Sequence, residues 1–257
     1  MTDLWLAATG VANLAATPVY AYVGARLYER RVPSPARLPA AQFSIWWWGL
    51  GATGAITGAE GLVAAVGTLQ LALGLTMYLV TVLADCVILW GLVGYLLYLY
   101  TGRNYLVPLS AFYAVFYVVT LYWILASGPS SISVASGKPI VVYAHVVGGP
   151  ILAFVLLGLI VPELIAVVLY ASLIRRTTDR TLRYRIAFVS AAIGLFFLFG
   201  FFAPTGSVWA LVTAVVDAVS AVLALIAFFP PSAVQRVLRV RPVDTEDESG
   251  EGVQVSV

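Results

Sequence analysis

The sequence has few charged residues and almost no cysteine, histidine or lysine. Charged residues make up 10% of the chain, which holds one cysteine, one histidine and one lysine. A lone cysteine, Cys86, excludes an intramolecular disulfide and a cysteine-based metal site. The net charge of only +2 argues against a nucleic-acid partner. We therefore expect neither a metal site nor a nucleic-acid interface.

Apolar residues dominate the remainder of the chain. They make up 61% of the sequence, and the mean hydropathy is +0.97. A water-soluble fold of this composition would have too few polar side chains to cover its surface. The composition thus predicts a multi-pass protein of the cell membrane, with the lipid bilayer as its solvent.

Seven apolar segments are long enough to cross a bilayer. They cover residues 4–25, 41–66, 70–100, 105–126, 140–174, 184–203 and 207–229. Each is expected to be helical, because an isolated strand in hydrocarbon leaves backbone groups unpaired and barrel-type alternation is absent. The prediction is an all-α membrane protein, a bundle of seven transmembrane helices over residues 1–230. A cytoplasmic basic segment and a disordered acidic tail follow over residues 231–257.

Arginines predict the orientation of the bundle, because basic residues are retained on the cytoplasmic side of a membrane. They follow the first, third, fifth and seventh segments, at Arg26, Arg30, Arg31, Arg37, Arg103, Arg175, Arg176, Arg180, Arg183, Arg185, Arg236, Arg239 and Arg241. The opposite connections carry one basic residue, Lys138. The N-terminus is therefore expected outside the cell and the C-terminus in the cytoplasm.

Small and aromatic residues predict how the helices pack. Glycines recur at helical spacing in the second segment, at Gly51, Gly54, Gly58 and Gly61. Such a face lets a neighbouring helix approach closely. The tryptophans at 46–48 near the cytoplasmic start of the same segment predict an interfacial belt, with a ligand site as the alternative. Pro150 and Pro162 predict a kink in the fifth segment.

Four carboxylates lie inside the apolar segments, at Glu60, Asp85, Glu163 and Asp217. An ionisable side chain within a bilayer costs about 2.5–3.5 kcal/mol on insertion scales. No arginine or lysine lies at a comparable depth, so these acids are candidates for a ligand site or a proton path. The alternative is structural, since a protonated aspartate can hydrogen-bond across helices for about 1 kcal/mol.

Polar neighbours extend the candidate site around both aspartates at helical spacing. The candidates for a ligand site or proton path are Asp85, Asp217, Glu163, Glu60, Thr81, Thr213, Ser220 and His145. The polar faces of the third and seventh helices are expected to point inward, so that Asp85 and Asp217 meet in one central cavity. His145 is placed toward the outer end of the fifth helix, where it can bond a neighbouring helix.

The layout resembles that of the microbial rhodopsins. The strings LADC around Asp85 and DAVSA from Asp217 look like that family's acid motifs on its third and seventh helices. The family's retinal-binding lysine corresponds to Ala221 here, and its third-helix arginine corresponds to Val82. The resemblance thus implies the seven-helix layout without covalent retinal or light-driven pumping, and we expect no cofactor.

The leading functional hypothesis is a receptor or sensor that binds a small apolar ligand between the third, fifth, sixth and seventh helices. Its cytoplasmic face would contact a cytoplasmic or membrane protein partner, or anionic lipid. The arginines assigned to that contact are Arg175, Arg176, Arg180, Arg183 and Arg185.

Two other classes are open from the sequence. One is a proton- or cation-coupled transporter or channel that uses the intramembrane carboxylates. The other is a structural subunit of a larger membrane complex. An enzyme is not expected, because the chain has no HExxH zinc motif, no DxxxD metal-diphosphate pattern and no glycine-flanked aspartate pair.

Overall fold

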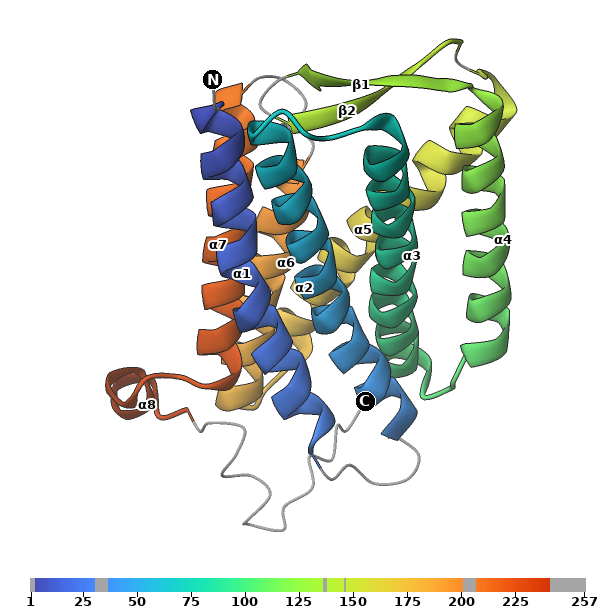
Figure 1. Cartoon of the computed structure of the whole chain (residues 1–257). Helices are drawn as coiled ribbons and strands as arrows, with labels where there is room; N and C mark the ends of the chain where they lie inside the picture. Colours follow the sequence, from blue (N-terminus) through green and yellow to red (C-terminus); the bar gives the residue numbers. More distant parts are fainter. Residues whose placement is uncertain (1–2, 31–36, 136–137, 146, 201–206, 241–257) are drawn as a thin grey trace.

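The computed structural model describes residues 3–30, 37–135, 138–145, 147–200 and 207–240, which are mostly helical (Figure 1). Its elements, in order, are α1 (Leu4–Tyr28), α2 (Arg37–Ala65), α3 (Leu71–Thr101), α4 (Leu106–Ala126), β1 (Pro129–Ala135), β2 (Lys138–Tyr143), α5 (Pro150–Arg176), α6 (Arg180–Gly200), α7 (Ser207–Phe228) and α8 (Ser232–Leu238). The long helices α1 to α7 overlap the seven apolar segments. The predicted acidic tail falls on residues 241–257, outside the described residues.

The predicted fifth segment, 140–174, is wrong at its start. Residues 140–143 belong to β2, which pairs antiparallel with β1. The β-branched run Ile140–Val142 suits a strand. α5 begins only at Pro150. Proline suits the first position of a helix, because the backbone N–H there has no partner within the helix and proline has no N–H. A second unpredicted element is α8, a short helix in the basic segment after residue 231.

Four helices, α3, α4, α5 and α7, are long and apolar enough to cross a membrane. They carry large apolar side chains on the outside of the molecule. Val118, Leu157 and Val168, for example, are 60%, 59% and 65% exposed. Water would penalise such a surface, whereas lipid tails solvate it. These helices are those of a membrane-embedded protein.

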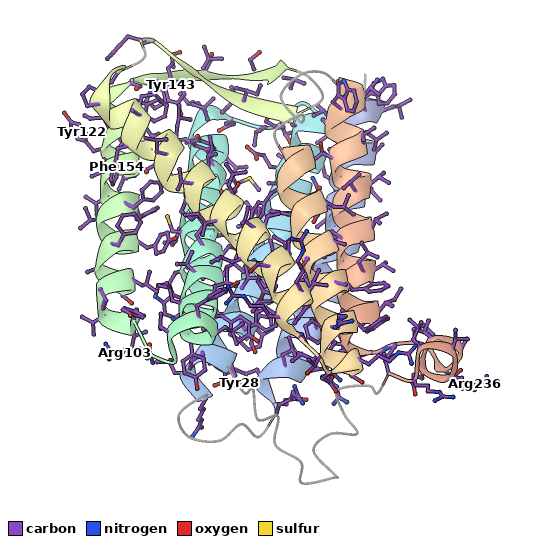
Figure 2. The ribbon with its side chains drawn as sticks, turned by 180° about the vertical axis from the view of Figure 1, so that it is seen from behind. Tyr28, Arg103, Tyr122, Tyr143, Phe154 and Arg236 are labelled. Atoms are coloured by element: carbon purple, nitrogen blue, oxygen red, sulfur yellow. The ribbon has the colours of Figure 1, made fainter. Side chains whose placement is uncertain are left out.

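The long helices lie side by side, with the β1–β2 hairpin across one end (Figure 1). α1 packs against α2 and α7, α3 packs against α2, α4 and α5, and α6 packs against α5 and α7. We call the end with the hairpin and the start of α1 the hairpin end. The opposite end carries Arg103, Arg236 and α8 and is called the arginine end (Figures 1 and 2).

A close helix contact joins α1 to the glycine face of α2, and it confirms the predicted close approach. A Cβ atom on Gly58 would lie 2.7 Å from Cγ of Leu14 and 2.9 Å from the Gly10 carbonyl oxygen. The Thr17 hydroxyl donates to the Gly51 carbonyl at 3.3 Å. Close backbone approach and hydrogen bonds to backbone carbonyls of this kind hold α1 to α2.

The predicted tryptophan belt is wrong for Trp46 and Trp47, which are 1% and 0% exposed. Their ring centroids lie 4.1 Å apart in the core, beside the stacked pair Phe43 and Tyr95 at 4.3 Å. Gly91 of α3 lets the backbone of α2 approach closely at this level, since an added Cβ would lie 2.6 Å from the Gln42 carbonyl oxygen and 3.2 Å from Cβ of Trp46. The two indole rings are therefore part of the packed aromatic core.

The α1–α2 contact predicts a specific loss of stability. Gly58→Leu should lower the free energy of unfolding by about 1–3 kcal/mol, because the side chain has no room against Leu14 and Gly10. Thermal unfolding of the detergent-solubilised protein measures this. Gly194→Ala on α6 is the control, since a Cβ there meets no described atom within 4 Å. Equal stability of the Gly58→Leu protein and its parent would contradict the packing.

Candidate functional site

The structure brings three of the four predicted carboxylates into one neighbourhood. Asp85 on α3 faces Thr53 of α2, and Glu163 of α5 interacts electrostatically with Asp85. Tyr78, two turns closer to the hairpin end on α3, interacts with both Asp85 and Glu60. We call Glu60, Tyr78, Asp85 and Glu163 the acid cluster. Its members come from α2, α3 and α5.

A residue of the hairpin interacts with the acid cluster from the hairpin end. Tyr143 of β2 lies there (Figure 2) and interacts with Tyr78 through its side chain. Its ring also packs against Trp123 of α4, with centroids 5.7 Å apart. Burial raises the pKa of Tyr143 above its ordinary value. Tyr143 was missed from sequence, because residues 140–143 were assigned to a helix and not to a strand that reaches back over α3.

Of the other predicted members of the site, Thr81 is bonded within its own helix and His145 lies in the hairpin region. Thr81 donates its hydroxyl to the Met77 carbonyl at 3.0 Å, a bond within α3 itself. His145 is exposed in the turn after β2, where its backbone N–H donates to the Ser127 carbonyl at 3.3 Å. Its predicted place on the fifth helix is wrong, because the hairpin occupies that stretch of chain.

Asp217 of α7 is buried in a separate site against α1. Tyr20 donates its hydroxyl to Oδ1 of Asp217 at 2.7 Å, and the same hydroxyl lies 3.1 Å from the Asp217 carbonyl. Ser220, one turn on, donates to the Ala192 carbonyl of α6 at 2.8 Å. Thr213 donates to the Trp209 carbonyl at 2.8 Å within α7. These bonds tie α7 to α1 and α6.

Asp85 and Asp217 have different partners in the structure: Asp217 accepts from Tyr20 of α1, whereas Asp85 faces Thr53 of α2. The main packing partners of α3 are α2, α4 and α5, whereas those of α7 are α1 and α6. α2 stands between the two acids. Thr53 faces Asp85, while an added Cβ on its neighbour Gly54 would lie 3.9 Å from Oδ2 of Asp217. Adjacent helical residues point about 100° apart, so the two acids approach different sides of α2.

A cavity of about 280 Å³ opens among the helices near the arginine end. Its walls come from α1, α2, α3, α5, α6 and α7 and are mainly aromatic and aliphatic. It is lined by Leu27, Arg30, Pro39, Ala40, Phe43, Tyr95, Tyr98, Leu99, Tyr170, Leu173, Thr177, Leu182, Arg185, Ile186, Val189 and Phe228. We call it the arginine-end cavity. An apolar cavity with a few polar groups is the usual form of a small-molecule site.

No protein-family model, curated protein or solved structure matches the chain. The function is therefore inferred from the residues of the acid cluster and of the arginine-end cavity.

The five arginines assigned to a cytoplasmic contact divide into two sets. Arg175, Arg176, Arg180 and Arg183 are exposed. Arg185, in contrast, is only 7% exposed and lines the arginine-end cavity. It lies one turn deeper on α6 than Arg180 and points into the helix interface, so it is not part of the exposed basic surface. An arginine inside an apolar helical pattern is the sequence signal that could have marked this cavity.

The Tyr20–Asp217 bond predicts a structural effect. Tyr20→Phe should lower the free energy of unfolding by about 1–3 kcal/mol, because a buried carboxyl loses its hydrogen-bond donor. Thermal unfolding in detergent measures the loss. Tyr22→Phe is the control, since Tyr22 is 47% exposed and packs through its ring. If Tyr20→Phe and Tyr22→Phe melt alike, Asp217 does not depend on this bond.

Proposed function

We propose that this protein is a seven-helix membrane receptor or sensor that binds a small, mainly apolar ligand in the arginine-end cavity. The hairpin end faces the outside of the cell, and the arginine end faces the cytoplasm. The cavity is the observation that carries the proposal, because its lining residues come from six helices whose ends a bound ligand can draw together.

The proposed topology extends the four most apolar helices to all seven. α1, α2 and α6 are of similar length but contain more glycine, alanine and arginine. The small residues among these, glycine and alanine, suit the inner positions of a membrane bundle, where helices touch one another. Arginines follow α1, α3, α5 and α7, which supports a cytoplasmic arginine end.

Signal output is proposed at the exposed arginines. Arg176 lies 5.7 Å from the ring centre of Tyr100, and Arg183 donates to the Thr177 carbonyl at 2.7 Å. Thr177 also lines the arginine-end cavity. A ligand that shifts the ends of α5 and α6 would therefore move the basic surface as well. A cytoplasmic protein with an acidic face, or anionic lipid, is the partner of matching charge.

A second candidate function is proton or cation transport through the acid cluster. The electrostatic contact between Asp85 and Glu163, continued by Tyr78 and Tyr143, is the observation that favours it. Such chains of titratable groups within a membrane are typical of proton relays. Asp217 is outside the acid cluster, since its carboxyl is held by Tyr20. A structural subunit would need none of these acids for activity.

Filling the cavity tests the receptor proposal. Leu182→Trp should abolish stabilisation by small lipophilic ligands, because Leu182 lines the cavity and the indole would occupy it. A panel of lipophilic compounds is screened by the thermal unfolding midpoint of purified protein. Leu164→Trp is the control, since Leu164 is 55% exposed on α5. A ligand that stabilises the Leu182→Trp protein as well as its parent would place binding elsewhere.

Proton flux separates the transport candidate from the receptor. Liposomes containing the protein should stay tight to protons under an imposed pH gradient if it is a receptor. If it is a transporter, flux should be lost in Asp85→Asn and Glu163→Gln, which remove the titrating groups of the acid cluster. Asp217→Asn is the matched control and should retain flux. A pH-sensitive dye inside the liposomes records the result, and flux in the parent protein would contradict the receptor class.

A further inference from the structure

The short helix α8 lies next to the end of a helix that can cross the membrane. α7 is apolar enough to span a bilayer and ends at Phe228, and Pro230 and Pro231 separate it from α8. The chain turns here, since proline interrupts a helix. α8 lies beside the bundle at the arginine end, with its axis across those of the long helices (Figures 1 and 2). It is therefore at the level where a membrane surface would meet the protein.

The apolar residues of α8 lie on one side of the helix. They are Ala233, Val234, Val237 and Leu238. At about 100° per residue they fall within an arc of about 140°. Val237 is 76% exposed, so the bundle does not cover this side. Water would penalise such a surface, whereas the boundary between lipid headgroups and lipid chains accepts it.

The polar residues of α8 lie on the opposite side. Ser232, Gln235, Arg236 and Arg239 line one shallow hollow together with Val240. The Nε–H of Arg236 donates to the Ser232 carbonyl at 3.4 Å, a bond within the helix itself. A guanidinium group has five N–H donors in a planar fork, and their geometry suits phosphate oxygens. This side therefore suits the phosphates of a lipid surface.

Contacts at both ends fix α8 to the rest of the chain. The Gln235 side-chain N–H donates to the Pro230 carbonyl at 2.7 Å before the helix. Arg239 has a φ of 52°, in the left-handed region that commonly ends a helix. The next residue, Val240, is only 3% exposed. The helix is thus held at its two ends, while its apolar side stays exposed between them.

We infer that α8 is a membrane-surface helix that binds anionic phospholipid. Arg236 and Arg239 contact the lipid phosphates, while Val237 and its apolar neighbours lie among the upper ends of the lipid chains. The bilayer around α7 brings lipid next to α8, which favours lipid over an acidic protein as the partner. This inference depends on the membrane embedding of the helices and goes beyond the proposed ligand binding in the arginine-end cavity.

Labels on the two sides of α8 test the inference in the full-length protein, in a Cys86→Ala background. An environment-sensitive dye is attached at Val237→Cys on the apolar side and, in a second protein, at Ser232→Cys on the polar side. Liposomes of phosphatidylcholine are compared with liposomes that also contain phosphatidylglycerol. In the anionic liposomes the label at 237 should be shielded from acrylamide and quenched by spin-labelled lipid chains. The label at 232 should stay accessible to acrylamide.

Substitution of the two arginines tests the role of charge. Arg236→Gln combined with Arg239→Gln should shift the label at 237 toward water about thirtyfold in the anionic liposomes, since each arginine near an anionic surface contributes about fivefold. Arg236→Lys combined with Arg239→Lys should keep most of the shielding, because lysine carries the same charge. Arg103→Gln is the matched control, an exposed arginine at the same end but outside α8, and should behave as the parent does.

Three results would overturn the inference. Equal access of acrylamide to position 237 in both kinds of liposome would show that anionic lipid does not hold α8, and would leave its two sides to a protein partner. Equal shielding at 237 and 232, unchanged by the glutamine variants, would place α8 against protein. A response to phosphatidylglycerol only after Asp244, Glu246, Asp247 and Glu248 are neutralised would assign the arginines to the chain's own acidic tail. None of these results bears on the arginine-end cavity, which the thermal unfolding screen tests separately.

Discussion

The main constraint on this chain is that hydrocarbon offers its backbone no hydrogen-bond partners. Helices meet that constraint within each segment, which is why apolar stretches of more than twenty residues fold as α3, α4, α5 and α7. The same solvent accepts apolar side chains on the outside, such as Val168 at 65% exposure. Cohesion must then come from close contact and from polar groups inside, so glycines and hydrogen bonds decide how the helices are arranged.

The glycine face of α2 has the largest effect on that arrangement. By letting α1 approach to the contact distances seen at Gly10 and Gly58, it places α2 between α1 and α3. The two intramembrane aspartates consequently serve different neighbourhoods. Asp217 accepts a hydrogen bond from Tyr20 at 2.7 Å, which fits a structural role. Asp85 interacts electrostatically with Glu163 and Tyr78, which is why the transport candidate is attached to the acid cluster and not to Asp217.

Much of the fold could be predicted from sequence because length and hydropathy report directly on bilayer spanning. The glycine stripe also carries its own physical meaning, as Gly58 shows. The hairpin could not be predicted in this way. A short apolar run such as Ile140–Val142 has the same hydropathy in a strand as in a helix, and periodicity over so few residues does not separate the two.

The site was harder to predict than the fold, because it depends on which helices are neighbours. The four acids were predicted correctly to lie within helices. Which residues face each acid, however, depends on where α2 lies among the other helices. Trp46 and Trp47 were assigned to the interface by general preference, whereas the packing of α2 buries them in the aromatic core with Phe43 and Tyr95. Arg185 was grouped with its exposed neighbours, because only the three-dimensional packing of α6 turns it toward the arginine-end cavity.

Sidedness of the two ends in intact cells tests the central claim most directly. In a Cys86→Ala background, one cysteine is placed at Ser133, exposed on β1, and in a second protein at Thr178, exposed between α5 and α6. A membrane-impermeant maleimide should label position 133 in intact cells and position 178 only after permeabilisation. Labelling of position 178 in intact cells, with position 133 protected, would contradict the proposed membrane topology.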